Sequence, residues 1–109
     1  MQGINAFSLE FGLSSISGAL NTKTVAASTY TILPTDNIVY VNYAGAVTLT
    51  LPASPIAKQL LLIKDISGAA ATYNITVDGT IDGVTNPVIG SNYGGAMITY
   101  NGSSWSEHS

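Results

Sequence analysis

The feature that most constrains this chain is a succession of short β-prone runs, each closed by turn residues. Runs rich in Val, Ile, Leu, Thr and Tyr alternate with Gly, Pro, Asn and Asp from residue 21 onward. In residues 47–51, Val47, Leu49 and Leu51 are expected on one strand face and threonines on the other. Pro52 ends that strand. The pattern predicts an all-β domain: a small antiparallel β-sandwich or a jelly-roll or barrel-like module, with almost no helix.

Turn signals divide the second half of the chain. Asp78-Gly79 is the strongest hairpin signal. Further turns are expected at Asp82-Gly83, Asn86-Pro87 and Gly94-Gly95. The sequence contains no internal repeat of fixed period, which argues against a solenoid.

With 109 residues, the chain has room for one domain. We divide it into an N-terminal arm, residues 1–20, and a β-rich module, residues 21–109. In the arm, apolar residues alternate with polar ones as in a half-buried strand. We expect the apolar residues to attach the protein to a partner; they are Phe7, Leu9, Phe11 and Leu13. The arm could equally complete the core of its own domain.

Charged residues are unusually scarce. They make up 8% of the chain, against about 25% in ordinary soluble domains, and the formal net charge is -3. Because 46% of the residues are hydrophobic, we expect part of the surface to be buried against other copies of the chain. Three cationic side chains are too few for a phosphate-binding surface, so nucleic acid is not an expected partner. A membrane is not an expected partner either, because no apolar run comes close to the roughly 18 residues that a membrane-spanning helix needs.

The run 60–66 departs from simple alternation. Leu61 and Ile63 share one face, and the opposite face is also apolar: Leu60, Leu62 and Ile66. A central strand of a two-layer domain would bury both faces, as would a strand with one face against a symmetry mate. These last three residues are our candidates for a core or trimer interface.

Acidic residues give the one hint of metal or catalytic chemistry. Asp78 and Asp82 are four apart, and Asp65 could approach them. Calcium sites use such turns, and a carboxylate pair could serve a hydrolase. However, Asp before Gly is also what tight turns select, which is the interpretation we adopt. We therefore predict no enzymatic activity, no catalytic residue, no cofactor and no metal ligand, with a cation near this pair left open.

The aromatic side chains admit two interpretations. They could pack between strands or form a surface that contacts carbohydrate: Tyr30, Tyr40, Tyr43, Tyr73, Tyr93, Tyr100 and Trp105. Tyr93, within Ser-Asn-Tyr-Gly-Gly, is the one we expect to be most exposed, and it is our candidate for contact with a receptor.

Seven phrases, in this order, resemble a small all-β module of bacteriophage tail-fibre, spike and head-fibre or decoration proteins. They are V-A-x-S-x-Y-T-I (25–32), V-T-x-T-L-P (47–52), I-K-D-x-x-G-x-A (63–70), N-I-T-V (74–77), I-D-G (81–83), N-Y-G (92–94) and T-Y-N-G (99–102), followed by Trp105. The resemblance covers about three quarters of the chain. Ala57-Lys58-Gln59 departs from it, because a glycine-containing turn is frequent there, and residues 1–20 have no counterpart.

The resemblance implies a non-enzymatic, usually homotrimeric component on the exterior of a phage particle. Its partners would be its own copies and other capsid or tail proteins. The alternative is a receptor- or glycan-binding tip that acts in adsorption to the host cell.

Overall fold

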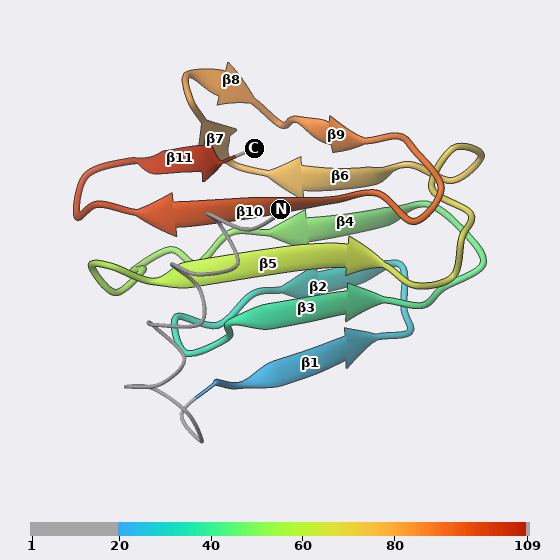
Figure 1. Ribbon diagram of the computed structural model, residues 1–109, viewed down its shortest axis with the longest axis horizontal. Coiled ribbons are helices and arrows are strands. Elements are labelled where there is room, and N and C mark those ends of the chain that lie inside the picture. Colours follow the sequence, from blue (N-terminus) through green and yellow to red (C-terminus); the bar gives the residue numbers. More distant parts are fainter. Residues whose placement is uncertain (1–19, 109) are drawn as a thin grey trace, which may run out of the picture.

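The β-prone runs form two sheets in the computed structural model, which describes residues 20–108 (Figure 1). The seven-stranded sheet has the order β1 (Thr22–Val25), β3 (Ile38–Val41), β5 (Leu60–Asp65), β10 (Gly95–Tyr100), β11 (Trp105–His108), β7 (Thr80–Ile81) and β8 (Val84–Thr85). The four-stranded sheet has the order β2 (Thr29–Thr31), β4 (Val47–Thr50), β6 (Ile75–Asp78) and β9 (Val88–Ile89). The predicted arm residues Phe7, Leu9, Phe11 and Leu13 lie outside the described residues.

The expected all-β sandwich is confirmed, but its strands are not uniformly antiparallel. The pairs β1–β3, β3–β5, β2–β4 and β4–β6 are all parallel. The antiparallel pairs are β7–β8, β6–β9, β5–β10 and β10–β11. Both sheets are therefore mixed.

The parallel pairing follows from the path of the first six strands. The chain changes sheet after every strand, so each sheet receives its strands in the same direction (Figure 1). Strands begin at residues 22, 38 and 60 in one sheet and at 29, 47 and 75 in the other. The absence of a fixed repeat led us to expect no solenoid, yet this half winds as a short coil. The intervals vary, which is why no period is visible in the sequence.

Of the two turns predicted at Asp-Gly pairs, the hairpin at Asp78-Gly79 is wrong and the turn at Asp82-Gly83 is confirmed. Asp78-Gly79 does not close a hairpin, because β6 before it and β7 after it belong to different sheets. The hairpin forms at Asp82-Gly83, between the antiparallel strands β7 and β8. Both of these residues have positive φ, 52° and 78°, as a tight two-residue turn requires.

The core lies between the two sheets and is aliphatic apart from Trp105. The longer strands contribute alternate residues to it, as the period of two predicts, whereas both residues of β8 are exposed. Val47, Leu49 and Leu51 are all buried, in agreement with the sequence analysis. The other core side chains are those of Val25, Ile32, Val39, Val41, Leu61, Ile63, Ala70, Ile75, Val77, Ile81, Ile98 and Trp105.

A carboxylate is buried at the end of β5. Asp65 is only 1% exposed, yet both of its oxygens are bonded. Oδ1 accepts from the backbone N–H groups of Ser67 (3.0 Å) and Gly68 (3.1 Å) and from the Ser67 hydroxyl (2.6 Å). Oδ2 accepts from the N–H groups of Ala70 and Tyr93, both at 3.0 Å. The carboxylate thus joins two loops, one directly after β5 and one directly before β10.

Those hydrogen bonds set the ionisation of Asp65. Burial alone raises the pKa of the carboxyl group, but the bonds from Ser67, Tyr93, Ala70 and Gly68 outweigh it and lower the pKa from 3.8 to about 2. A second buried carboxylate, Asp36, accepts from the Tyr30 hydroxyl at 2.7 Å. Burial of the Tyr30 hydroxyl is the main cause, and the hydrogen bond to Asp36 the second, of a rise in the pKa of Tyr30 to about 12.

The depressed pKa of Asp65 predicts a specific acid sensitivity. Its contribution to stability is complete above about pH 4 and is lost as the pH falls through about 2, because the unfolded state then binds the proton more readily. A shift of roughly two units corresponds to about 2.5 kcal/mol. Urea unfolding of the wild type at pH 5 and pH 2 should show a loss of that order.

Asp65→Asn provides the comparison. An amide of nearly the same size cannot accept hydrogen bonds with both polar atoms, so the variant should be less stable at pH 5. It should also lose less stability than the wild type between pH 5 and pH 2. An equal loss in both proteins would show that other carboxylates cause the acid sensitivity.

Candidate functional site

The outer face of the seven-stranded sheet carries apolar side chains. Leu62, on the central strand β5, lies directly opposite Ile38 of β3 and Met97 of β10. Leu60 and Tyr40 occupy the flanking positions of the same face, opposite Thr99 and Lys64 respectively. All five of these large side chains are half-buried. This group, Ile38, Tyr40, Leu60, Leu62 and Met97, is referred to below as the apolar face.

The outer face of the other sheet has a different character. Thr29, Thr48 and Thr76 lie side by side across β2, β4 and β6. The next row consists of Thr31, Thr50 and Asp78. Threonine is well suited to an exposed strand, since its branched side chain favours β structure and its hydroxyl contacts water. The sandwich thus has one outer surface covered by threonines and another whose centre is apolar, with Lys64, Thr99 and His108 around that centre.

A shallow hollow of about 490 Å³ opens over the apolar face, above Ile38, Tyr40, Leu62 and Met97. Gly95 forms part of it. A Cβ at Gly95 would lie 2.3 Å from the carbonyl oxygen of Ile63, so only glycine allows β10 to approach β5 this closely. The hollow therefore depends on tight pairing of the two central strands.

The sequence analysis placed Leu60, Leu62 and Ile66 on the face opposite Leu61 and Ile63. The structure has this arrangement: Leu61 and Ile63 are buried in the core, while Leu60 and Leu62 are only half-buried. Ile66, just beyond the end of β5, is 41% exposed. The chain's own described residues therefore do not enclose the three candidates.

Lys64 and Tyr93 lie beside the apolar face. The Lys64 ammonium donates a hydrogen bond to the Tyr93 carbonyl oxygen. Tyr93 has positive φ, 60°, and is 59% exposed. Its ring lies against Gly68, where an added Cβ would be 2.5 Å from Cζ. The candidate receptor contact is thus an exposed ring on a loop held by Asp65.

The acidic residues do not converge. Asp65 ends β5 and Asp78 ends β6, and these strands run in opposite directions, so the two carboxylates lie at opposite ends of the sandwich (Figure 1). Asp82 accepts a hydrogen bond from the Glu107 N–H group at 3.1 Å, a structural role. Within residues 20–108, no group of three or more His, Cys, Asp or Glu side chains is arranged to hold a metal ion.

Most aromatic residues pack rather than gather on one surface. Tyr30, Tyr43 and Tyr100 lie against the core, and Trp105 is buried within it. Tyr73 and Tyr93 are exposed, at 44% and 59%. The aromatic side chains do not form one carbohydrate-contact surface.

Sequence reasoning missed two features of this region. It did not assign Ile38, Tyr40 or Met97 to the apolar face, because that requires the pairing of three strands distant in sequence. It also considered Asp65 only as a carboxylate that could approach Asp78 and Asp82. The phrase Asp65-Ile66-Ser67-Gly68 carried a usable signal, since an Asp followed two residues later by Ser and then Gly favours a turn closed on the carboxylate.

Comparison of the chain with models of known protein families gives no match, and comparison with curated proteins gives none either. Among the described residues there is no helix of the length and apolarity that would cross a membrane.

Proposed function

We propose that this chain is a non-enzymatic structural subunit of a bacteriophage particle, a spike, short fibre or capsid-decoration protein that assembles as a homotrimer. The observation that carries the proposal is the contrast between the two outer surfaces. If both outer faces of the sandwich contacted water, both would be expected to carry polar residues, as the face with the threonine rows does. The apolar face is the surface suited to contact with other copies of the chain.

The composition supports the same role. With 8% charged residues, the chain has few ionic groups with which to hold single copies apart in solution. Contact between copies through the apolar face would remove Leu60, Leu62 and Met97 from water. A closed ring of copies also leaves no apolar face available for further association. The choice of three copies, and of a phage particle, comes from the resemblance of the seven sequence phrases.

Attachment to the particle is assigned to residues 1–20. Their alternating apolar residues, Phe7 to Leu13, suit an added strand or an apolar groove on another protein. Location on the particle exterior follows from the same proposal.

A charged residue introduced into the apolar face tests whether the copies associate through it. Light scattering on the purified wild type should give the mass of a trimer at micromolar concentration. Leu62→Glu should shift the protein to a single chain with unchanged far-ultraviolet circular dichroism, since a buried unpaired carboxylate opposes association. Thr48→Glu is the matched control, because Thr48 is also half-buried, on a central strand of the other sheet.

The control variant should remain trimeric. A wild-type protein that is a single chain at this concentration would overturn the proposal. A trimeric Leu62→Glu variant would show that the copies meet elsewhere.

Removal of residues 1–20 tests attachment. The truncated chain should remain a folded trimer and should no longer co-sediment with phage particles, whereas the full chain should. Loss of folding would assign the arm to the core instead. Co-sedimentation equal to that of the full chain would place attachment within residues 21–109.

The second candidate function, a receptor-binding tip, is favoured by the exposed ring of Tyr93. Tyr93→Ala should abolish binding of the purified protein to host cells if this loop makes the contact. Its backbone N–H group still donates to Asp65, so the fold should persist. Unchanged binding by the variant would remove this loop from consideration.

A further inference from the structure

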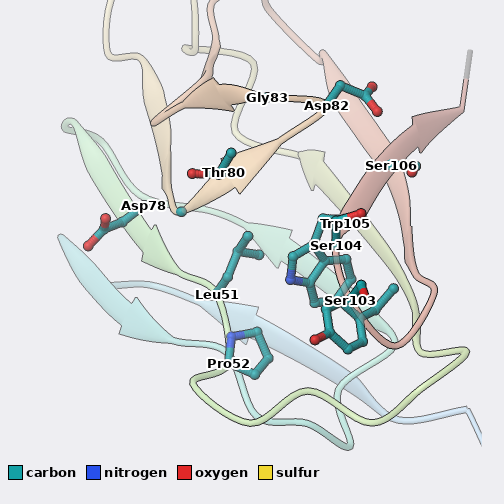
Figure 2. A pocket seen from close by; sticks show the side chains of 12 residues that line it. Leu51, Pro52, Asp78, Thr80, Asp82, Gly83, Ser103, Ser104, Trp105 and Ser106 are labelled. Carbon is teal, nitrogen blue, oxygen red and sulfur yellow. The ribbon is translucent and has the colours of Figure 1, made fainter.

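The loop that joins β10 to β11 carries the chain's single Asn-Gly pair, Asn101-Gly102. Residues 101–104 form this loop, and all four are exposed. Ser103 and Ser104 lie at the margin of a cavity of about 680 Å³, on a part of the hairpin that water reaches (Figure 2). The Asn-Gly pair therefore lies where its side chain and backbone can react with solvent.

The Asn101 side chain is held through its carbonyl oxygen. Oδ1 accepts hydrogen bonds from the N–H groups of Ser103 (2.8 Å) and Ser104 (2.9 Å), as in an Asx turn. These two donors withdraw electron density from Cγ, which makes this carbon a better electrophile. They also point at the atom that gains negative charge when a nucleophile adds to Cγ, as the donors of an oxyanion hole do. The hairpin thus activates the side-chain amide.

A nucleophile lies next to this amide in the sequence. Within residues 20–108, no group accepts a hydrogen bond from the Gly102 N–H or from the Asn101 Nδ2 group. Gly102 has no Cβ to shield its nitrogen, and its φ of 99° favours glycine. An added Cβ would come no closer than 3.9 Å to Ala57, so the space beside Gly102 is open. Neither the attacking nitrogen nor the leaving nitrogen has to break a hydrogen bond within the described fold.

We propose that Asn101 is a site of spontaneous deamidation in the folded protein, with water as the only co-reactant. The Gly102 nitrogen loses its proton to solvent base and bonds to Cγ of Asn101. The Cγ–Nδ2 bond breaks, and Nδ2 takes up a proton and leaves as ammonia, which closes a five-membered succinimide. Water then opens the ring: addition at Cγ leaves aspartate, and addition at the main-chain carbonyl carbon leaves isoaspartate. The proposal does not depend on assembly or on a role in a phage particle.

The fold withholds these conditions from the other described asparagines. After Asn92, the N–H group of Tyr93 donates to Asp65 at 3.0 Å, and after Asn86, Pro87 has no N–H group. The remaining ones each precede a branched or aromatic residue that crowds the attacking nitrogen: Asn21, Asn37, Asn42 and Asn74. Deamidation should therefore be selective for Asn101.

The two products differ in their effect on the hairpin. Aspartate keeps an oxygen that can accept from Ser103 and Ser104. Isoaspartate instead adds one carbon to the main chain of the loop that closes the Tyr100–Trp105 pair. The modification thus adds a negative charge in both products and lengthens the loop in one.

Peptide mapping of the full-length protein tests the proposal. The wild type is incubated at pH 8 and 37 °C, in buffer and in concentrated guanidinium chloride. Chymotrypsin then cleaves after Tyr100 and Trp105 and releases residues 101–105. Mass spectrometry follows conversion of the amide to the acid, and protein isoaspartyl methyltransferase identifies isoaspartate. In buffer, acid should form at residue 101 at least ten times faster than at any other described asparagine, and no slower than in guanidinium chloride. The rate should fall at pH 6, because the Gly102 nitrogen reacts only after losing its proton.

Gly102→Ala should slow the conversion at least tenfold, because its Cβ crowds the attacking nitrogen. Gly83→Ala is the matched control: Gly83 also has positive φ, 78°, in a hairpin turn, and an added Cβ would meet nothing within 4 Å. This control should convert as the wild type does. If alanine at residue 102 unfolds the loop, the comparison of the wild type in buffer and in guanidinium chloride still decides.

Three results would each overturn the proposal. Asn101 could stay intact in buffer while it converts in guanidinium chloride, which would show that the hairpin protects it. Acid could form as fast at another described asparagine. A folded Gly102→Ala variant could convert as fast as the wild type.

Discussion

The buried carboxylate of Asp65 is the interaction on which the arrangement around β5 and β10 depends. It holds the turn that follows β5 through Ser67, Gly68 and Ala70, and it holds the loop before β10 through Tyr93. Tyr93 lies 28 residues after Asp65 in the sequence. By fixing both, the carboxylate fixes where β10 meets β5, and that pairing creates the apolar face. A buried charge of this kind is tolerable only because its oxygens are satisfied.

The winding of the first six strands explains how one short chain acquires two such different outer surfaces. Each passage from sheet to sheet places consecutive strands in different layers, so the two surfaces draw on different parts of the sequence. The polar surface comes from Thr-x-Thr phrases in β2 and β4. The apolar surface comes from β3, β5 and β10. One outer surface can therefore be adapted to a partner while the other remains suited to water.

Local patterns in the sequence predicted a good part of this fold. The alternation of residues 47–51, the two-sided character of residues 60–66 and the turn at Asp82-Gly83 all reflect contacts within a few residues. The parallel pairing could not be predicted in that way, because it depends on which distant strands meet. Asp78-Gly79 illustrates the limit: a pair that favours a tight turn can equally lead the chain into the other sheet. The acceptor role of Asp65 likewise depends on Tyr93.

Among the described residues, the two edges of the sandwich differ in what their backbones offer. At one end the outermost strands are β1 and β2, with four and three residues; at the other they are β8 and β9, with two each. An outermost strand presents unpaired N–H and C=O groups that can bond to a further chain. The two edges of the sandwich are thus not equivalent: a strand supplied from outside would find the longer backbone template beside β1 and β2, where it would extend either sheet in the direction opposite to β8 and β9.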